Sequence, residues 1–327
     1  MTFHLYRLRF HLRARRTLFF PAGQVANRLR GALGKTLKGL SCNPSCQDAK
    51  SCADRSTCSY ARLFEPCALP DHPGPSGLQD LPRPFVLRPR ALENCRLHPG
   101  QSAPLDIHLF DTRLDTVQHM IVAVANLAAN LLTDDMADTR WGALVLERVT
   151  VLDSHGSSLA AIFEQGQLVA PPGPLALSLA PSLDHVNALR LRFLSPTEIK
   201  AEGSTNSTPS FQALFSRVRD RLSTLRNLYA DGPLSVDFRA MGERAGRVTL
   251  VHAGLGERSV YRRSFRTGQT HSLGGFVGEL EYAGDMGEFV PWLEAGQFTG
   301  VGRQTVWGKG EYTVESSNAT ASVATCL

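Results

Sequence analysis

Four cysteines stand close together in one short stretch of the chain. Cys42, Cys46, Cys52 and Cys58 follow the spacing C-x3-C-x5-C-x5-C. Four thiolates in a short irregular loop suit a tetrahedral structural zinc site, and a metal would order a stretch with little apolar content to bury. The spacing is looser than in a zinc-ribbon knuckle. An iron–sulfur cluster and unligated thiols therefore stay open as alternatives, with Cys67 as a substitute ligand.

A second group of residues indicates an anionic partner. The glycine-rich segment, residues 300–310, reads GVGRQTVWGKG. Glycine lets a backbone turn and approach a partner closely, and the interleaved Arg303 and Lys309 favour a partner with negative charge. A hairpin that only links two strands is the alternative. The predicted nucleic-acid contacts in this segment are Gly300, Gly302, Arg303, Gly308, Lys309 and Gly310.

Arginine dominates the basic residues in the rest of the chain. Its planar guanidinium pairs with phosphate in a bidentate way and stacks on nucleobases, although a GC-rich genome would produce the same bias. The expected helix at 210–229 carries four arginines opposed by one acidic residue, Asp220, which is typical of a surface that follows phosphates. The predicted contacts here and in a later basic stretch are Arg217, Arg219, Arg221, Arg226, Arg262, Arg263 and Arg266.

Composition and motifs disfavour several classes of protein. No apolar run approaches the roughly 20 residues that span a bilayer, and arginines interrupt the N-terminus, so we expect a soluble, cytoplasmic protein. Seven cysteines, an odd number, argue against a disulfide framework in a reducing compartment. The glycine-rich segment lacks the strand–loop–helix context of a nucleotide-binding fingerprint. No paired carboxylates at metal-ligand spacing indicate a two-metal nuclease.

The elements that must position these residues follow a repeated order. Residues 3–13 alternate apolar and polar side chains, as a strand does. Residues 24–40 place apolar side chains at every fourth position, and residues 115–133 have one apolar face, so both are expected helices. Further strands are expected at 85–88, 105–110 and 144–152, with a hairpin through 162–169. The resulting order, strand–helix–strand–strand–helix–strand, is ferredoxin-like.

A proline-rich linker at 171–181 precedes a second set of elements. We expect a helix at 210–229, a short helix at 288–293, and strands at 188–194, 248–251, 259–265, 276–282 and 312–314. The predicted class is therefore α+β, with two tandem ferredoxin-like (RRM-like) domains. The first covers 1–175, with a cysteine-rich insertion at about 41–84. The second covers 176–327, with an arginine-rich helical insertion at about 206–232 and the glycine-rich segment.

Six motifs in a fixed order carry a resemblance to a known family. They are NRLRGALG at 27–34, CSYARLFEP at 58–66, RPFVL at 83–87, FLSPT at 193–197, GGFVG at 274–278 and the glycine-rich segment. From about residue 3 to 314, the chain resembles a CRISPR precursor-crRNA-processing endoribonuclease family of the repeat-associated mysterious protein (RAMP) superfamily. Each motif alone is weak, whereas six in order are specific.

The resemblance implies binding of the CRISPR repeat hairpin and cleavage within the repeat without a metal or other catalytic cofactor. A ribose 2′-hydroxyl would attack the adjacent phosphate and leave a cyclic phosphate and a 5′-hydroxyl. This needs in-line positioning, proton transfer and stabilisation of negative charge. The family further implies that the product guide RNA stays bound and that other subunits of a CRISPR effector complex are partners.

The chain departs from the family at the expected catalytic position. Many relatives carry a histidine on or just after the first helix, but none lies between His11 and His72. Arginine stabilises charge but is a poor general base, and a lysine there could protonate the leaving oxygen. His271 is the remaining acid–base candidate, ahead of His4 and His11. The predicted catalytic residues are therefore Arg28, Arg30, Lys35, Lys38 and His271.

Two rival interpretations stay open. The four basic residues of the first helix could form a solvated face or bind RNA without cleaving it. The chain would then be a non-catalytic RAMP subunit that holds guide RNA in an effector complex, an interpretation that the missing histidine favours. An unrelated zinc-stabilised RNA-binding protein is the third interpretation, and the ordered motifs count against it.

Overall fold

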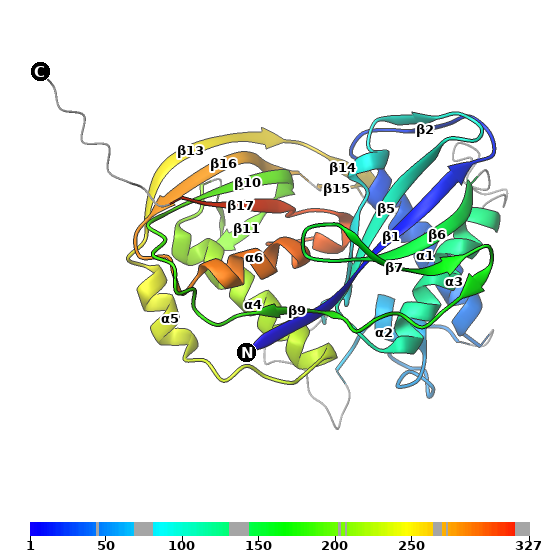
Figure 1. Ribbon diagram of the computed structural model, residues 1–327, viewed down its shortest axis with the longest axis horizontal. Coiled ribbons are helices and arrows are strands. Elements are labelled where there is room, and N and C mark those ends of the chain that lie inside the picture. Colours follow the sequence, from blue (N-terminus) through cyan, green and yellow to red (C-terminus); the bar gives the residue numbers. More distant parts are fainter. Residues whose placement is uncertain are drawn as a thin grey trace, which may run out of the picture.

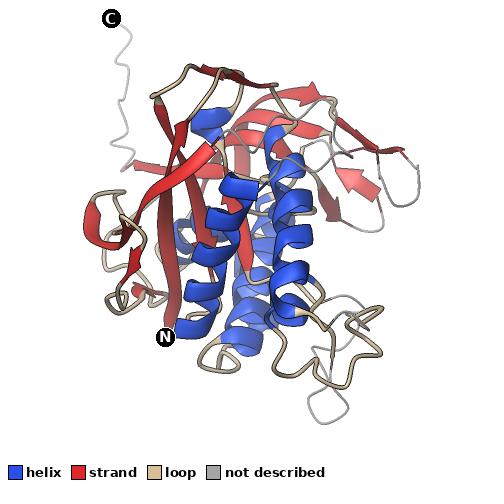
Figure 2. Cartoon of the chain, turned by 90° about the vertical axis from the view of Figure 1, so that its right-hand side faces the viewer, coloured by secondary structure: helices blue, strands red, loops and turns tan. Residues whose placement is uncertain are grey.

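The chain folds into two halves that lie side by side, each built on an antiparallel sheet (Figure 1). The computed structural model describes residues 1–43, 46–68, 81–130, 144–201, 204–206, 208–263, 270–272 and 274–317. Seen from the side, the long helices run together through the middle and the strands flank them (Figure 2). The predicted α+β class is confirmed.

The first sheet is organised around its longest strand, β1 (Thr2–Ala14). The alternation of its side chains buries Leu8, Phe10 and Leu12 on one face. Its neighbours are β5 (Ser102–Leu109) and β6 (Leu144–Leu152), both antiparallel to it. The full order is β3-β5-β1-β6-β7-β8, and its outer strands are β3 (Phe85–Arg88), β7 (Ser158–Glu164) and β8 (Gln167–Leu168).

Two helices close the first core, α1 (Val25–Ser41) and α3 (Leu114–Asn130). Leu29, Leu33 and Leu37 of α1 are buried at the predicted four-residue spacing. Burial of each such side chain contributes about 1.5–3 kcal/mol, which makes this stripe the main reason for helix α1 to lie on the sheet. The succession β1-α1-β3-β5-α3-β6 with sheet order β3-β5-β1-β6 is the expected ferredoxin-like unit.

The second half repeats this topology. Its sheet has the order β13-β16-β10-β17. These strands are β10 (Ala188–Thr197), β13 (Thr249–Arg258), β16 (Gly275–Ala283) and β17 (Tyr312–Ser317). The covering helices are α4 (Phe211–Tyr229) and α6 (Val290–Thr299). The second ferredoxin-like unit is therefore confirmed as well. The predicted helical insertion at about 206–232 is wrong, because α4 is the first covering helix of that unit and buries Phe211, Leu214 and Phe215 in its core.

Two helices of the second half differ from the expectation. Helix α5 (Phe238–Ala245) lies where no element is expected, and Asp237 caps it by accepting hydrogen bonds from two backbone amides. Helix α6 runs further than the predicted 288–293. It begins with Pro291 in its first turn, where proline is tolerated, and ends at Gly300, whose φ of 72° is left-handed.

Short elements connect the larger ones. They are α2 (Ser59–Phe64), η1 (Arg90–Leu92), η3 (Thr305–Trp307), β2 (Leu18–Phe20), β4 (Cys95–Leu97), β11 (Ile199–Ala201), β12 (Ser204–Asn206), β14 (Tyr261–Arg263) and β15 (Thr270–Ser272). Helix α2 lies within the predicted irregular insertion, and its Phe64 packs 3.0 Å from where a side chain on Gly34 would begin. Residues 69–80 of that insertion lie outside the described residues.

The predicted linker at 171–181 is wrong in one respect, because it contains a strand. Strand β9 (Leu175–Ser178) pairs antiparallel with the first residues of β1, from Thr2 opposite Ser178 to Leu5 opposite Leu175. Leu175 and Leu177 pack against the second core, to which Leu5 also belongs. The start of β1 thus lies beside β9 against the second half, and the strand runs from there into the first half (Figure 1). Apolar packing rather than a free linker joins the two halves.

Candidate nucleic-acid interface at the glycine-rich segment

The glycine-rich segment forms a tight loop whose two ends are bonded to each other. The Val301 amide donates to the Gly310 carbonyl at 2.9 Å, and the Gly310 amide donates to the Pro196 carbonyl at 3.1 Å. A Cβ atom on Gly310 would lie 1.9 Å from the Val301 oxygen, and one on Gly302 would lie 2.3 Å from the Glu198 oxygen. Both glycines also have positive φ. Only glycine fits these positions.

The same segment packs against the first domain. Val306 belongs to the first hydrophobic core, and Trp307 packs against it. The guanidinium of Arg30 on α1 lies 4.5 Å from the centre of the Trp307 indole, a cation–π contact. At Gly308 a Cβ atom would lie 3.0 Å from Ala26 of α1 and 3.3 Å from the Leu87 carbonyl. The segment is therefore wedged between the two domains.

Lys309 is a buried charged residue of the glycine-rich segment, with only 6% of its surface exposed. Burial lowers the pKa of the Lys309 ammonium to about 8. The nearby carboxylate of Glu93 opposes that shift, and the guanidinium of Arg258 adds to it. Glu93 itself accepts a hydrogen bond from the Gly23 amide, at the turn that leads into α1, and burial raises its pKa. A lysine poised near neutral pH thus lies beside the start of α1.

An exposed aromatic side chain lies close to this place. The Val260 side chain lies 3.7 Å from where a Cβ on Gly23 would be, so the connection from β13 to β14 touches the turn before α1. The next residue, Tyr261, is 69% exposed. An exposed tyrosine beside basic groups offers a face on which a nucleobase stacks. We refer to Glu93, Lys309, Arg258, Tyr261 and the first turn of α1 as the junction.

The four basic residues predicted on α1 do not converge on one point. Arg28 bonds to Gln24 in the first turn, at the junction. Arg30 is held on Trp307. Lys35 is exposed, and Lys38 reaches the other way, toward the Gln47 carbonyl at 3.4 Å and the Tyr60 ring at 5.8 Å. Positions 28 and 35 share a helix face because they are about two turns apart, whereas positions 30 and 38 lie on other faces of the helix.

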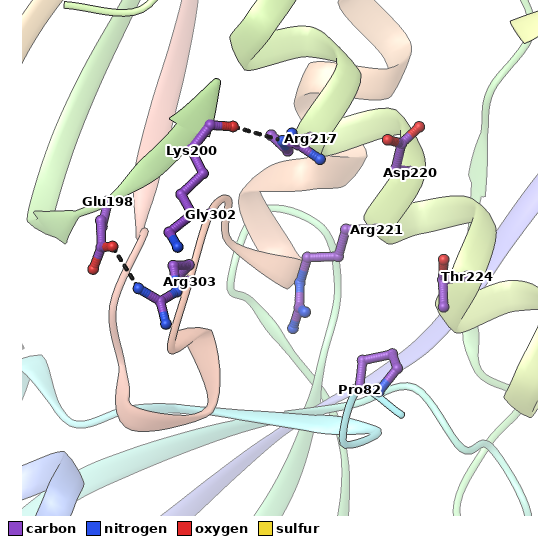
Figure 3. A pocket seen from close by; sticks show the side chains of 9 residues that line it. All are labelled: Pro82, Glu198, Lys200, Arg217, Asp220, Arg221, Thr224, Gly302 and Arg303. Atoms are coloured by element: carbon purple, nitrogen blue, oxygen red, sulfur yellow. Dashed lines mark hydrogen bonds and ion pairs between the residues drawn. The ribbon is translucent and has the colours of Figure 1, made fainter. Parts of the chain in front are cut away.

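The predicted arginines of α4 fall into two groups. Arg219 pairs with Asp220 at 2.8 Å and donates to the Phe238 carbonyl. Arg226 donates to the Thr2 carbonyl at 2.9 Å. Both of these hold the fold together. Arg217 and Arg221 instead line a pocket beside Gly302 and Arg303 of the glycine-rich segment (Figure 3).

The basic hairpin of the second domain is described only as backbone. Arg262 of β14 lies opposite His271 of β15, and Arg263 lies opposite Thr270. Arg266 lies outside the described residues. Arg262, a predicted RNA contact, and His271, a predicted catalytic residue, are therefore directly opposite each other on neighbouring strands. The roles predicted for them stay predictions.

The four cysteines of the insertion lie together. The sulfurs of Cys42 and Cys58 are 4.0 Å apart. Thiol hydrogen bonds also link Cys42 to Cys46 and Cys46 to Cys52. Burial, followed by the neighbouring Cys58, raises the pKa of the Cys42 thiol to about 12. As the side chains stand, no three His, Cys, Asp or Glu residues of the described chain surround one point closely enough to hold a metal ion.

Three basic side chains meet at the C-terminal end of α6, and no sequence pattern predicts this cluster. The last carbonyls of a helix carry the negative end of its dipole. Arg88, His108 and Arg221 contact the carbonyl oxygens of Gln297, Phe298 and Thr299 at 3.3, 2.9 and 3.1 Å, respectively. Burial holds the pKa of His108 well below its usual value, so its neutral ring donates. Arg88 and His108 are first-domain residues, so the contacts also join the domains.

Comparison with known proteins follows this division into two halves. Residues 191–312 match the family model described as CRISPR-associated endoribonuclease Cas6, and residues 3–174 match the family model AF_1859_N, described as an N-terminal domain. The AF_1859_N model spans more than half of the chain, so the chain belongs to that family, and its second half matches the Cas6 endoribonuclease family. The Cas6 match ends at Tyr312, so it includes the whole glycine-rich segment.

Solved Cas6 structures have the same fold. The Cas6 of Thermus thermophilus (TTHB231) is 15% identical, with a TM-score of 0.50 over 95% of this chain and 98% of that one. Its product complex gives 16% identity and a TM-score of 0.53 over 95% and 100%. A chain of a partial Cas6–RT–Cas1–Cas2 complex is 14% identical, with a TM-score of 0.54 over 97% of this chain and 46% of that one. No curated protein matches the sequence.

The helices of the structure bear on the expectation that no segment crosses a membrane. Within the described ranges, none of them is both long and apolar enough to cross a bilayer.

Proposed function

We propose that the chain binds the repeat hairpin of a precursor CRISPR RNA and cleaves it at the junction, without a metal. The 2′-hydroxyl gives its proton to solvent water as its oxygen bonds to the adjacent phosphorus, the bond from phosphorus to the 5′-oxygen breaks, and the 5′-oxygen takes a proton from Lys309. The products are a 2′,3′-cyclic phosphate and a 5′-hydroxyl. The observation that carries this proposal is Lys309, a buried lysine with a pKa of about 8 beside the start of α1.

Each group at the junction has a role that follows from its chemistry. Lys309 donates the proton to the leaving 5′-oxygen, because an acid with a pKa near neutral can both hold and release a proton. Glu93 keeps Lys309 charged and in position. Arg258 and Arg28 stabilise the negative charge that develops on the phosphoryl oxygens, and Tyr261 stacks on a nucleobase. The site thus relies on charge and position more than on a proton relay.

The proposal includes the fate of the product and the partners. The cut guide RNA stays bound, so each protein molecule turns over once, and other CRISPR subunits receive the complex in the cytoplasm. Two solved relatives support this direction: one Thermus thermophilus Cas6 is a product complex, and another similar chain comes from a Cas6–RT–Cas1–Cas2 complex.

Cleavage of a labelled repeat hairpin in excess EDTA tests the reaction. We expect one cut within the repeat and a cyclic phosphate end. A substrate with a 2′-deoxyribose at the cut site should bind equally well and stay whole, since it lacks the nucleophile. Cleavage of that deoxy substrate, or a strict need for a divalent ion, would contradict the proposed mechanism.

The second candidate is a guide-RNA-binding subunit without catalysis. It is favoured by the absence of a histidine on α1 and by the occupation of Arg30 and Lys38 in packing contacts. Tight binding of the all-ribose hairpin with no cut after long incubation would support this candidate over the enzyme.

We also propose that Cys42, Cys46, Cys52 and Cys58 bind one structural zinc ion. The thiol contacts already hold two pairs of these side chains together, so a small closing movement of the loop would complete a tetrahedron. We expect one zinc per chain by elemental analysis, and none in a variant with both Cys46→Ser and Cys52→Ser. Cys95→Ser, in strand β4 outside the insertion, is the matched control. Absence of zinc from the purified wild-type protein would end this proposal.

A further inference from the structure

A pocket opens beside the glycine-rich segment, on the side of α4. Its volume is about 470 Å³. It lies between α4, the β10–β11 connection and the glycine-rich segment, and the end of the insertion closes one side (Figure 3). The lining residues are Pro82, Glu198, Lys200, Arg217, Asp220, Arg221, Thr224, Gly302 and Arg303.

Positive charge in this pocket exceeds the negative charge that could neutralise it. The Glu198 carboxylate pairs with Arg303 at 2.7 Å, and the Asp220 carboxylate pairs with Arg219, outside the pocket, at 2.8 Å. For the other basic groups, Lys200, Arg217 and Arg221, no carboxylate of the described residues lies within 4.0 Å. Two of them donate to backbone carbonyls: Arg217 Nε to that of Lys200, and Arg221 Nε to that of Thr299.

Arg221 is the most constrained of these groups. Burial, and then repulsion by Arg88, lower the pKa of its guanidinium to about 9. Arg88 is only 7% exposed, and its Nη1 has no hydrogen-bond partner in the described structure. Two guanidiniums thus lie near each other. The Glu311 carboxylate favours the charged form of Arg88, but no carboxylate of the described residues lies within 4.0 Å of Arg221. Such an arrangement costs free energy unless a negative charge offsets it.

The end of helix α6 offsets only part of this charge. A helix terminus is equivalent to roughly half an elementary charge, whereas Arg88 and Arg221 carry one full charge each. Lys200 and Arg217 add two more at the pocket mouth. With the Glu311 carboxylate counted against Arg88, the charges of Arg221, Lys200 and Arg217 still exceed that of the helix terminus. An anion of one or two charges would neutralise the excess.

We propose that this pocket binds a backbone phosphate of the RNA, apart from the junction where the cut occurs. Arg221 contacts the phosphate from the floor of the pocket, Arg217 and Lys200 contact it from the sides, and Thr224 offers a hydroxyl. The glycine-rich segment joins the two places: Gly302 and Arg303 border the pocket, and Gly308 and Lys309 border the junction. The RNA strand crosses the segment between them. This inference rests on the proposed function.

Equilibrium binding of the uncleavable 2′-deoxy repeat hairpin at several salt concentrations tests the inference. The test variant combines Lys200→Ala with Arg217→Ala, two side chains at the pocket mouth. We expect dissociation constants about tenfold higher than wild type, because the variant cannot form the charge-assisted hydrogen bonds to phosphate. The slope of log K against log salt should become shallower by about 0.7 for each single-strand phosphate that the variant no longer neutralises.

The control variant is Arg239→Ala, on α5, whose side chain is exposed and pairs with Glu243. It removes one arginine from the surface and should bind RNA as wild type does. If the double variant also matches wild type in affinity and salt slope, the pocket inference is wrong. A second variant, Arg221→Gln, should weaken binding at least as much, provided that its melting temperature is like that of wild type.

A further arm separates RNA phosphate from a free anion. Inorganic phosphate or a mononucleotide at millimolar concentration should stabilise wild type against heat only slightly, since it lacks the contacts along the strand. Strong stabilisation by inorganic phosphate alone, without an effect of the variants on RNA affinity, would overturn the assignment to RNA.

The outcomes for the pocket and for the cleavage reaction are distinguishable. If wild type binds the hairpin through Lys200 and Arg217 but does not cut the all-ribose hairpin, the pocket stands and the proposed reaction fails. If wild type cuts the hairpin and the double variant binds it as wild type does, the reaction stands and the pocket fails.

Discussion

The two ends of the glycine-rich segment are charged in different ways. At the junction, one buried lysine has a carboxylate, Glu93, close enough to favour its charged form. At the pocket, Arg221 is buried near a second guanidinium and has no such carboxylate among the described residues. A paired lysine with a pKa near neutral suits proton transfer, whereas unpaired arginines suit a permanent anion. The comparison thus separates a site for proton transfer, the junction, from a site for binding phosphate, the pocket.

The largest effect is expected from Gly310→Ala, which should disturb both ends at once. The new methyl group would lie 1.9 Å from the Val301 carbonyl oxygen, in a residue with φ of 67°. The backbone must therefore move, at a cost of about 3 kcal/mol or more. We expect a lower melting temperature and loss of both binding and cleavage. As a control, Gly39→Ala on α1 meets nothing within 4 Å and should not lower the melting temperature.

The next effect is expected from Lys309→Met, which should separate the two ends. Methionine keeps most of the buried volume but cannot donate a proton. We expect the single-turnover cleavage rate to fall by about 100-fold, while the dissociation constant for the deoxy hairpin changes by less than the pocket double variant does. A Lys309→Met protein that cleaves at the wild-type rate would remove Lys309 from the chemistry.

The pH dependence of cleavage is the third test. The pKa of Lys309 is lowered to about 8, so its proton is lost as pH rises through that value. If Lys309 is the proton donor, the cleavage rate should fall above about pH 8. Stability should change in the opposite sense. Between about pH 8 and the ordinary pKa of lysine, the unfolded chain binds more protons at Lys309 than the folded chain does. The free energy of unfolding should therefore rise with pH in this range.

Lys309→Arg gives the control for that profile. Arginine keeps its charge throughout this range, so the variant should show no fall in rate that centres near pH 8, whatever its absolute rate. A wild-type fall that persists unchanged in Lys309→Arg would assign the titration to another group.

The smallest effects are expected from single changes on α1. Arg28→Ala at the junction should slow cleavage by several-fold, since it removes one of several charges near the reacting phosphate. Lys38→Ala is the matched change, because its ammonium is directed at Gln47 and Tyr60 instead. It should leave the rate closer to wild type than Arg28→Ala does. Equal reductions in both variants would favour the prediction that the whole helix face acts together.

Much of the fold could be predicted because it depends on local patterns. The alternation in β1 and the four-residue spacing of Leu29, Leu33 and Leu37 each report burial on one face, and the structure has both. Helix α6 is predicted too short because its apolar residues surround it, so periodicity gives no clear boundary. Strand β9 resembles a linker in the sequence because the partners that bury Leu175 and Leu177 lie far away along the chain.

By itself, the sequence predicted the α+β fold from the order of its elements, and six ordered motifs carried the family resemblance. It also located the glycine-rich segment, since glycines that need positive φ are visible as residue types. Tertiary structure alone decided which charges act together. Lys309 meets Glu93, and Arg221 meets Arg88, across the boundary between two domains. Electrostatic interaction depends on distance and burial in space, and neither can be read from spacing along a chain.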